Sequence, residues 1–396
     1  MPWRQAMAIA ADMAPAAHIR VGLESALGAV LAQPIAAQAD LPPSRAAASA
    51  GYAVRGIGPW SIVPLGESAE VLDGAAAVVR AGDPIPAGAQ AVLPTSGALI
   101  EHTAGADIVL VGDPATAVPD RRPGMATPGE GILAAGAEAH AADLLLKPGV
   151  PVTAGTIALA AAAGLDELIV TPPATVTPVL LGSDLLASGP PRRGRSRDIV
   201  APLLPAWVMG SGGRCLVPVD GHLGDRDLAR QLDALGADLA VLTATSEPGI
   251  GTAVTAAVQQ LKAEILIERL AAAPADQVLL AELNDGRRIL ALPREPAAAV
   301  VVLALLLTPM LTALSGRGIG RFQTVMLRDG VEVSARERAL PVQIESGELA
   351  DLASAEPWSG PQGLSAVGAA DAIAFIDPGR GRRGDSVPAI ELPGHC

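Results

Sequence analysis

The chain has 396 residues, which is more than one hydrophobic core usually organises, so several domains are expected. Half of the residues are hydrophobic but only 2% are aromatic, and the formal net charge is −13. An acidic chain with so few aromatic side chains repels phosphate backbones and offers little surface for base stacking, which argues against nucleic acid as a partner.

The first half of the chain contains a helical pattern and then a β pattern. Residues 1–40 carry Ala and Leu patterning that predicts helix, and Leu41-Pro42-Pro43 ends it because proline cannot continue a helix. From Gly51 to about Val111, short apolar runs such as 52–54 and 108–111 are cut by Gly and Pro, which predicts a small β-rich domain. Residues 153–163 are predicted as a helix and 168–170 as a strand.

Residues 174–315 alternate strand and helix patterns, as a parallel three-layer α/β domain requires. A helix over 228–235 leads to a strand at 239–242, and the runs 278–283 and 287–292 flank Asn284-Asp285-Gly286, which is strong hairpin chemistry. Residues 297–314 carry no charge and approach the length of a membrane span. Pro309 and two threonines favour a helix buried beneath a sheet, and no membrane association is expected.

After Gly316 the chain returns to short β-like runs at 331–333, 372–376 and 387–392, which predict a small barrel. Cys215 and Cys396 are too few and too far apart for a disulfide framework or a zinc ribbon, and favour a reducing cytoplasm. Polar residues and prolines interrupt the Ala-rich N-terminus, which argues against a secretion signal. We therefore expect a cytoplasmic protein.

Four short segments carry a family pattern. In Ala81–Pro94, Gly82, Pro84, Pro86 and Gly88 shape a loop directly before the apolar run 91–93. The other segments are Gly51–Arg55 (G-Y-A-V-R), Leu181–Leu185 (L-G-S-D-L) and Pro293–Pro296 (P-R-E-P). They resemble the T-G-x-P-x-P-x-G-A-D-A-V-V, M-D-G-Y-A-V-R, T-G-D-E-L and P-G-N-P segments of the molybdopterin molybdenumtransferases, the family that includes MoeA and the gephyrin E domain.

This resemblance implies a multidomain α/β architecture. The expected parts are a helical linker domain at 1–41 and 139–173, an inserted β-rich domain at 42–138, a three-layer α/β molybdopterin-binding domain at 174–316 and a C-terminal β-barrel at 317–396. It also implies a homodimer. The family inserts molybdenum from molybdate into adenylylated molybdopterin and releases AMP, with a divalent cation such as Mg²⁺ held by carboxylates.

The resemblance also implies site residues. The acids expected to organise the chemistry are Asp184, Glu138 and Asp225, and no metal ligands are assigned beyond them. The positions expected to bind the ligand are those that the family motifs carry: Gly82, Pro84, Pro86, Gly182, Ser183, Asp198, Thr243, Thr245, Ser246, Pro293, Arg294 and Pro296.

Several family groups are replaced in this chain. Ala50, Ser183 and Thr252 stand where the family has acids, and the glycines of its S-G-G turn and the lysines of its K-P-G-K-P segment are absent at 243–245 and 273–277. Losing one preorganised catalytic group costs on the order of 100-fold in rate. We therefore expect a molybdenum cofactor biosynthesis protein that is catalytically impaired and acts in molybdopterin binding or assembly, with an assembly protein or a molybdoenzyme as partner. The alternatives are an active divergent molybdenumtransferase and a binding or regulatory protein on the same scaffold.

Overall fold

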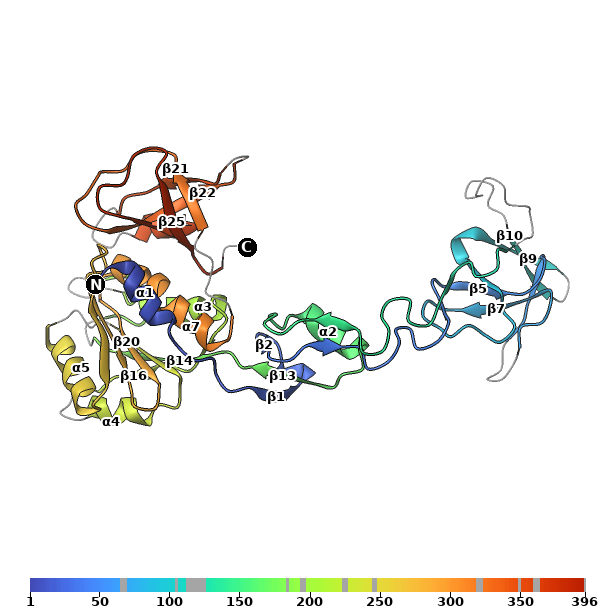
Figure 1. Ribbon diagram of the computed structural model, residues 1–396, viewed down its shortest axis with the longest axis horizontal. Coiled ribbons are helices and arrows are strands. Elements are labelled where there is room, and N and C mark those ends of the chain that lie inside the picture. The colour runs from blue at the N-terminus through green and yellow to red at the C-terminus, as the bar shows by residue number, and fades with distance from the viewer. Residues whose placement is uncertain are drawn as a thin grey trace. The chain divides into compact units, whose positions relative to one another are not determined.

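The computed structural model describes residues 1–64, 70–103, 106–111, 126–182, 185–192, 197–222, 227–243, 248–317, 323–347, 350–358 and 364–394. The chain divides into two compact units, whose elements are labelled in Figure 1. Unit 1 comprises Met1–Gln33, Pro148–Thr156 and Glu167–Cys396, and unit 2 comprises Pro34–Lys147 and Ile157–Asp166. The four-part division expected from the sequence stays a prediction.

Unit 2 is built on a six-stranded sheet with the order β8-β5-β7-β6-β10-β9. The strands are β5 (Gly51–Val54), β6 (Trp60–Ile62), β7 (Ala75–Val79), β8 (Ala91–Pro94), β9 (Ala98–Thr103) and β10 (Ala106–Val111). Alternate residues serve two small cores, because Ala53 packs on one face while Tyr52 and Val54 pack on the other with the fully buried Trp60. The strands predicted at 52–54, 91–93 and 108–111 are confirmed.

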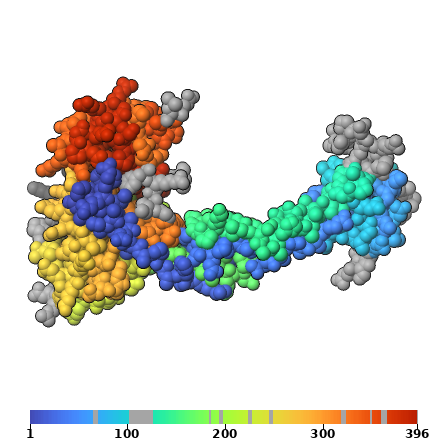
Figure 2. Space-filling model, in the orientation of Figure 1, coloured from blue at the N-terminus to red at the C-terminus, as the bar shows by residue number. Residues whose placement is uncertain are grey.

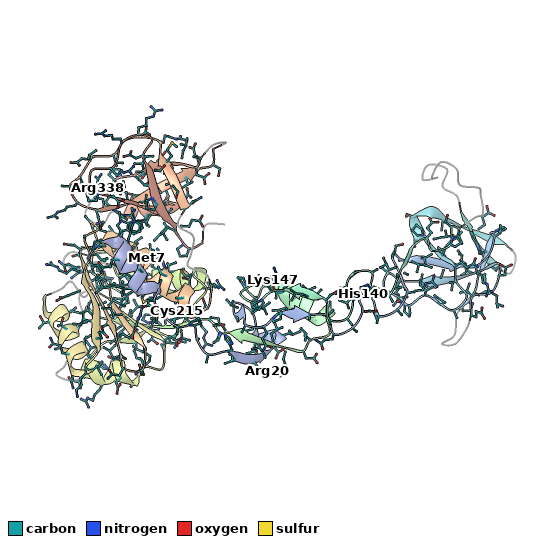
Figure 3. All side chains as sticks on the ribbon, viewed as in Figure 1. Met7, Arg20, His140, Lys147, Cys215 and Arg338 are labelled. Atoms are coloured by element: carbon teal, nitrogen blue, oxygen red, sulfur yellow. The ribbon has the colours of Figure 1, made fainter. Side chains whose placement is uncertain are left out.

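Two short strand pairs complete the strands of unit 2. They are β3 (Ile35–Ala36) with β12 (Leu144–Leu146), and β4 (Ala46–Ala47) with β11 (Ile132–Leu133). His140 and Lys147 on this stretch, and Arg20 in unit 1, can be located in Figure 3. The predicted helix at 153–163 is confirmed as α2 (Ala154–Ala162).

The expectation of helix through residue 40 is wrong after Ala11. Only α1 (Trp3–Ala11) forms, and the chain then enters β1 (Ile19–Gly22), β2 (Val30–Leu31) and β3, with a 3₁₀ turn at Leu23–Ser25. β1 and β2 flank β13 (Glu167–Thr171) in a three-stranded antiparallel sheet. Pairing with a strand about 150 residues away supplies hydrogen bonds that offset the Ala-rich helical propensity, and a local pattern cannot reveal such a partner.

The α/β part of unit 1 contains a seven-stranded sheet with the order β15-β14-β17-β20-β19-β18, in which β16 also pairs with β14. The strands are β14 (Thr175–Leu180), β15 (Arg214–Cys215), β16 (Val219–Asp220), β17 (Leu239–Leu242), β18 (Glu264–Arg269), β19 (Gln277–Glu282) and β20 (Arg288–Ala291). The predicted hairpin at Asn284-Asp285-Gly286 is confirmed, and Gly286 has φ +86°. The sheet is therefore mixed, not wholly parallel as expected, because this hairpin makes β19 antiparallel to β20.

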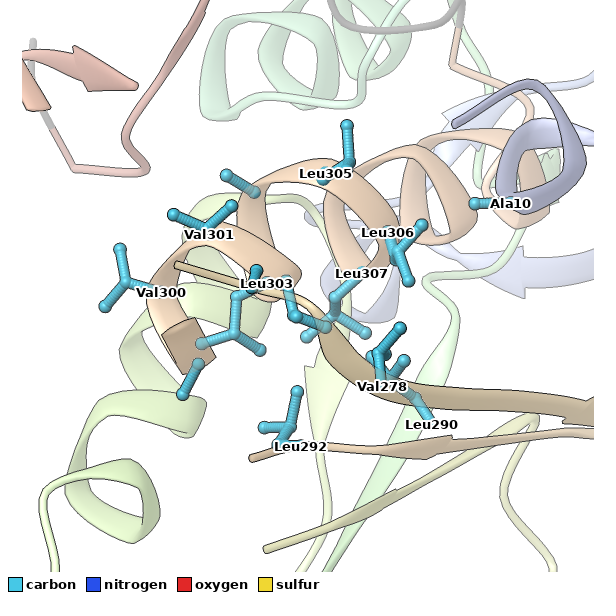
Figure 4. Packing of buried hydrophobic residues seen from close by; sticks show 14 of the residues in the cluster. Ala10, Val278, Leu290, Leu292, Val300, Val301, Leu303, Leu305, Leu306 and Leu307 are labelled. Carbon is cyan, nitrogen blue, oxygen red and sulfur yellow. The ribbon is translucent and has the colours of Figure 1, made fainter. Parts of the chain in front are cut away.

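Helices cover both faces of this sheet, which confirms the three layers. On one face lie α4 (Asp227–Ala234) and α5 (Pro248–Gln260). On the other lie α1, α3 (Val200–Gly210) and the continuous helical segment formed by α6 (Pro296–Val302), the π-helical Leu303–Leu307 and α7 (Thr308–Leu314). The side chains of Leu303 and Leu307 lie on the side of the helix that faces Val278, Leu290 and Leu292 of the sheet, whereas Leu305 lies on the opposite side (Figure 4).

The segment Pro296–Leu314 is long and apolar enough to cross a membrane, but 83% of its apolar window is buried inside the protein. It is the central helix of the largest core cluster, as the buried-helix interpretation predicted.

The C-terminal part of unit 1 is a closed barrel with the strand order β21-β23-β22-β24-β25, as predicted. Its elements are β21 (Gln323–Leu327), β22 (Arg338–Glu345), β23 (Leu352–Ala355), the short helix α8 (Leu364–Gly368), β24 (Ala372–Ile376) and β25 (Ser386–Glu391). The strand predicted at 331–333 is wrong: this segment belongs to the loop between β21 and β22, where Val331 donates its backbone N–H to Gly381.

The N-terminal helix α1 joins the barrel to the sheet, and Figure 2 shows its blue surface between the two. Trp3 stacks on Phe375 at a centroid distance of 4.8 Å, and its indole N–H donates to Asp377 at 3.3 Å. Arg4 donates twice to the Asp377 carboxylate, at 2.6 and 2.9 Å, so α1 is bound to the barrel by both apolar and charged contacts.

Candidate functional site

Three of the predicted ligand positions follow three neighbouring parallel strands. Gly182 comes after β14, Thr243 after β17 and Pro293 after β20, and these strands are adjacent in the sheet. We call the edge formed by these three residues the carboxyl edge. The chain leaves β14 toward β15 and β16 on one side and then crosses to β17 on the other, so the topology switches direction between β14 and β17. Open α/β sheets bind ligands outside the strand ends at such a switch point.

Thr243 joins the ends of β14 and β17. Its side chain is buried, and its hydroxyl accepts the backbone N–H of Leu181 at 3.0 Å and donates to the carbonyl of the same residue at 3.2 Å. Its backbone N–H donates to Val179 at 3.1 Å. The hydroxyl that the sequence offered to a ligand is therefore used within the fold.

Asp198 caps the start of α3. Its Oδ1 accepts the backbone N–H groups of Val200 at 2.9 Å and Ala201 at 3.1 Å. A carboxylate at this position satisfies free donors of the first turn and interacts favourably with the positive end of the helix. This second candidate ligand residue therefore also has a structural role.

The segment from Pro293 to Pro296 connects β20 to α6, as the sequence predicted. Pro296 is the first residue of the helix, where a missing N–H costs nothing because that group has no partner within a helix. Pro293 is buried, and Arg294 is half-buried beside it. Gly182 has φ +99°, a conformation that side chains disfavour, so the strand turns sharply as it leaves the sheet.

Within the described part of the structure, none of the remaining predicted positions lies at the carboxyl edge. Asp184, Ser183, Asp225, Thr245 and Ser246 lie outside the described residues, so their roles stay predictions.

Glu138 and the loop with Gly82, Pro84 and Pro86 belong to unit 2. Glu138 is exposed, and Gly82 has φ +83° in a tight turn whose N–H donates to Ala47. Within the described ranges, no three His, Cys, Asp or Glu side chains are grouped as a metal site requires.

Two pockets lie at opposite edges of the sheet. The first, about 370 Å³, lies at the amino ends of β17 and β20 beside the end of α1. Its polar side chains are occupied: Asp238 accepts from Thr175 at 2.7 and 2.6 Å, and Arg288 pairs with Glu282 at 2.7 Å. Arg287 caps the end of α4 through the carbonyls of Leu235 and Asp233.

The second pocket, which we call the edge pocket, has a volume of about 400 Å³ and lies on the same edge as the end of β20. It is lined by α5, β18 and β19 through Gly251, Val254, Thr255, Glu268, Arg269, Gln277, Val278, Leu279 and Ala291. The sequence prediction missed these residues because none of them keeps a residue of a family motif, although Gln277 stands in the segment compared with K-P-G-K-P. Cys215 lies on β15, at the other end of the strand order, and is not a nucleophile candidate, since burial raises the pKa of its thiol.

Comparisons with known proteins agree with the fold described above. The family model described as MoeA N-terminal region (domain I and II) matches residues 1–164. The molybdopterin molybdenumtransferase 2 of Mycobacterium tuberculosis is 31% identical over 211 residues, 49% of this chain and 48% of the relative. The molybdopterin molybdenumtransferase of Synechococcus elongatus is 26% identical over 323 residues, 76% of each chain. The resemblance to the MoeA family is confirmed.

The solved structures give the same fold. The molybdopterin biosynthesis MoeA protein from Pyrococcus horikoshii aligns over 100% of both chains with a TM-score of 0.71 at 21% identity. A molybdenum cofactor biosynthesis protein from Pyrococcus furiosus aligns over 99% of both chains with a TM-score of 0.57 at 15% identity. The predicted multidomain α/β fold with a C-terminal barrel is thus confirmed. The chain spans about half the length of the first curated relatives that it matches.

Proposed function

We propose that this MoeA-type protein acts in molybdenum cofactor biosynthesis by binding a molybdopterin-type molecule at the carboxyl edge, with impaired molybdate insertion. The observation that carries the proposal is the switch point between β14 and β17, which is where an open α/β sheet binds a ligand. The family that the chain resembles supplies the chemical class of that ligand.

The impaired chemistry is supported by the state of the polar positions that the family motifs name. Thr243 and Asp198 are committed to hydrogen bonds within the fold. Ala50 and Thr252 stand where the family has acids, and the lysines of its basic segment are absent at 273–277. Fewer groups are left to hold a divalent cation, molybdate and phosphate together, and losses within one catalytic unit are not additive. In this proposal the protein is a cytoplasmic homodimer that passes its ligand to an assembly protein or a molybdoenzyme.

The test is a titration of the full chain with molybdopterin and with adenylylated molybdopterin, followed by addition of Mg²⁺ and molybdate and quantification of AMP. We expect saturable binding with little molybdate-dependent AMP release. Rapid AMP release would instead establish an active divergent molybdenumtransferase, provided that Asp184→Asn abolishes the release. Glu264→Gln, at the exposed end of β18, is the control and should leave the release unchanged. Failure to bind either pterin refutes the proposal and leaves a binding or regulatory protein of another kind.

A further inference from the structure

The edge pocket combines an apolar floor with solvent-exposed polar side chains. Val254 and Ala291 are buried and Leu279 is half-buried, and they present aliphatic surface at its base. Glu268, Arg269 and Gln277 lie at its rim and are exposed. A concave site of about 400 Å³ with an apolar base and a few convergent polar groups has the size and character of a small-molecule pocket.

The polar groups distinguish this pocket from the one at the opposite edge. Across the described part of the chain, no hydrogen bond or ion pair is recorded for the side chains of Glu268, Arg269 or Gln277. In the other pocket, by contrast, Asp238 and Arg288 already have internal partners. A ligand in the edge pocket would therefore replace the water on these side chains without breaking hydrogen bonds within the fold.

The wall that carries these groups is held in place by the backbone. Arg269 and Gln277 are cross-strand partners in the β18–β19 pair. The amino group of Met1 donates to the carbonyl of Arg269 at 3.0 Å, and the N–H of Ala271 donates to the carbonyl of Met1 at 2.8 Å. The start of the chain thus fixes the end of β18, and a site supported in this way needs less ordering when a ligand binds.

We propose that the edge pocket binds the pterin ring of the ligand, an inference that rests on the proposed function. A carboxylate accepts from adjacent N–H donors in two parallel, charge-assisted hydrogen bonds, and the 2-amino group and ring N–H of a pterin offer that pair. Glu268 supplies this acceptor. The Gln277 amide donates to the ring carbonyl, the aliphatic floor contacts the ring face, and Arg269 holds a phosphate outside the pocket.

The experiment uses the full chain and three probes that each carry one phosphate: 6-hydroxymethylpterin monophosphate, guanosine monophosphate and AMP. Guanine carries the same pair of N–H donors as a pterin, whereas adenine does not. We expect the pterin to bind most tightly and AMP to show no dependence on Glu268. Glu268→Gln replaces one acceptor oxygen by a donor and should weaken pterin binding by about 10-fold or more, the equivalent of one charged hydrogen bond. Gln277→Ala should weaken it several-fold.

Matched controls lie on the same elements. Glu264→Gln changes a carboxylate at the other end of β18, and Gln260→Ala changes an amide at the end of α5, and neither residue lines the pocket. Both controls should bind pterin as the unaltered protein does. If Glu268→Gln also binds pterin normally while the unaltered chain binds adenylylated molybdopterin, the pocket assignment is refuted and the proposed function stands. Tighter binding of guanosine monophosphate than of pterin would overturn the assignment in favour of a purine nucleotide. If the unaltered chain does not bind molybdopterin at all, both the pocket assignment and the proposed function are refuted.

Discussion

Arg288 offers the sharpest test of how the α/β part of unit 1 is held together. Its side chain is only 5% exposed and pairs with Glu282 at 2.7 Å. The same guanidinium donates to three carbonyls at the end of α1, those of Ile9 at 3.0 Å, Ala10 at 3.2 Å and Asp12 at 2.7 Å. One buried cation therefore satisfies both an acidic side chain on β19 and the free carbonyls of a helix end.

Replacement by methionine keeps an unbranched apolar stem and removes the guanidinium group that carries the donors. Breaking a buried ion pair by removing one partner costs about 3–5 kcal/mol, since the remaining charge is left without compensation. Glu282 is 35% exposed and water can reach it through the adjoining pocket, which lowers this cost. The three carbonyls lose their donor as well, at about 1 kcal/mol or more each where water cannot replace it. We expect Arg288→Met to lower the free energy of unfolding of unit 1 by about 3–5 kcal/mol.

The assay is equilibrium unfolding in urea followed by tryptophan fluorescence, because Trp3, Trp207 and Trp358 all lie in unit 1. With an m-value of about 3 kcal/mol/M, the midpoint should fall by about 1–1.7 M urea at unchanged slope. Arg20→Met is the matched control, since the Arg20–Glu167 pair is exposed and such pairs contribute about 1 kcal/mol at most. Equal shifts for the two variants would refute the assignment of Arg288 as the anchor of α1.

Two further predictions concern contacts within unit 1. The hydrogen bond from Arg4 lowers the pKa of the Asp377 carboxyl below its usual value of about 3.9, so its contribution to stability is present above that value and is lost as pH falls through the lowered pKa. Asp377→Asn should therefore be less stable than the unaltered chain at pH 7, and the difference in urea midpoint should shrink as the pH falls through the lowered pKa of Asp377. A pH-independent difference would contradict the ion-pair account. Thr243→Val should cost about 1–3 kcal/mol, because the N–H and carbonyl of Leu181 lose the buried hydroxyl that they share, and a midpoint shift no larger than that of Thr324→Val, at an exposed position of β21, would count against this bridge.

Local signals in the sequence were sufficient for much of the architecture. Asn284-Asp285-Gly286 predicted the β19–β20 hairpin because these residues suit the turn without help from distant parts of the chain. Pro293 and Pro296 predicted the passage from β20 to α6, and the uncharged run 297–314 predicted a helix too apolar to face water. The turn residues of 81–94 likewise marked the start of β8.

What the sequence by itself determined was therefore the type and order of most elements, because propensity, turn chemistry and hydrophobic period act over a few residues. Tertiary structure alone decided the partners. It turned residues 19–36 into strands by pairing β1 and β2 with β13, it committed Thr243 to Leu181, and it placed Arg288 against the end of α1. It also brought α5 against the β18–β19 pair to form the edge pocket. These contacts join segments far apart in the chain, and their hydrogen bonds and burial exist only after folding, so no local pattern carries them.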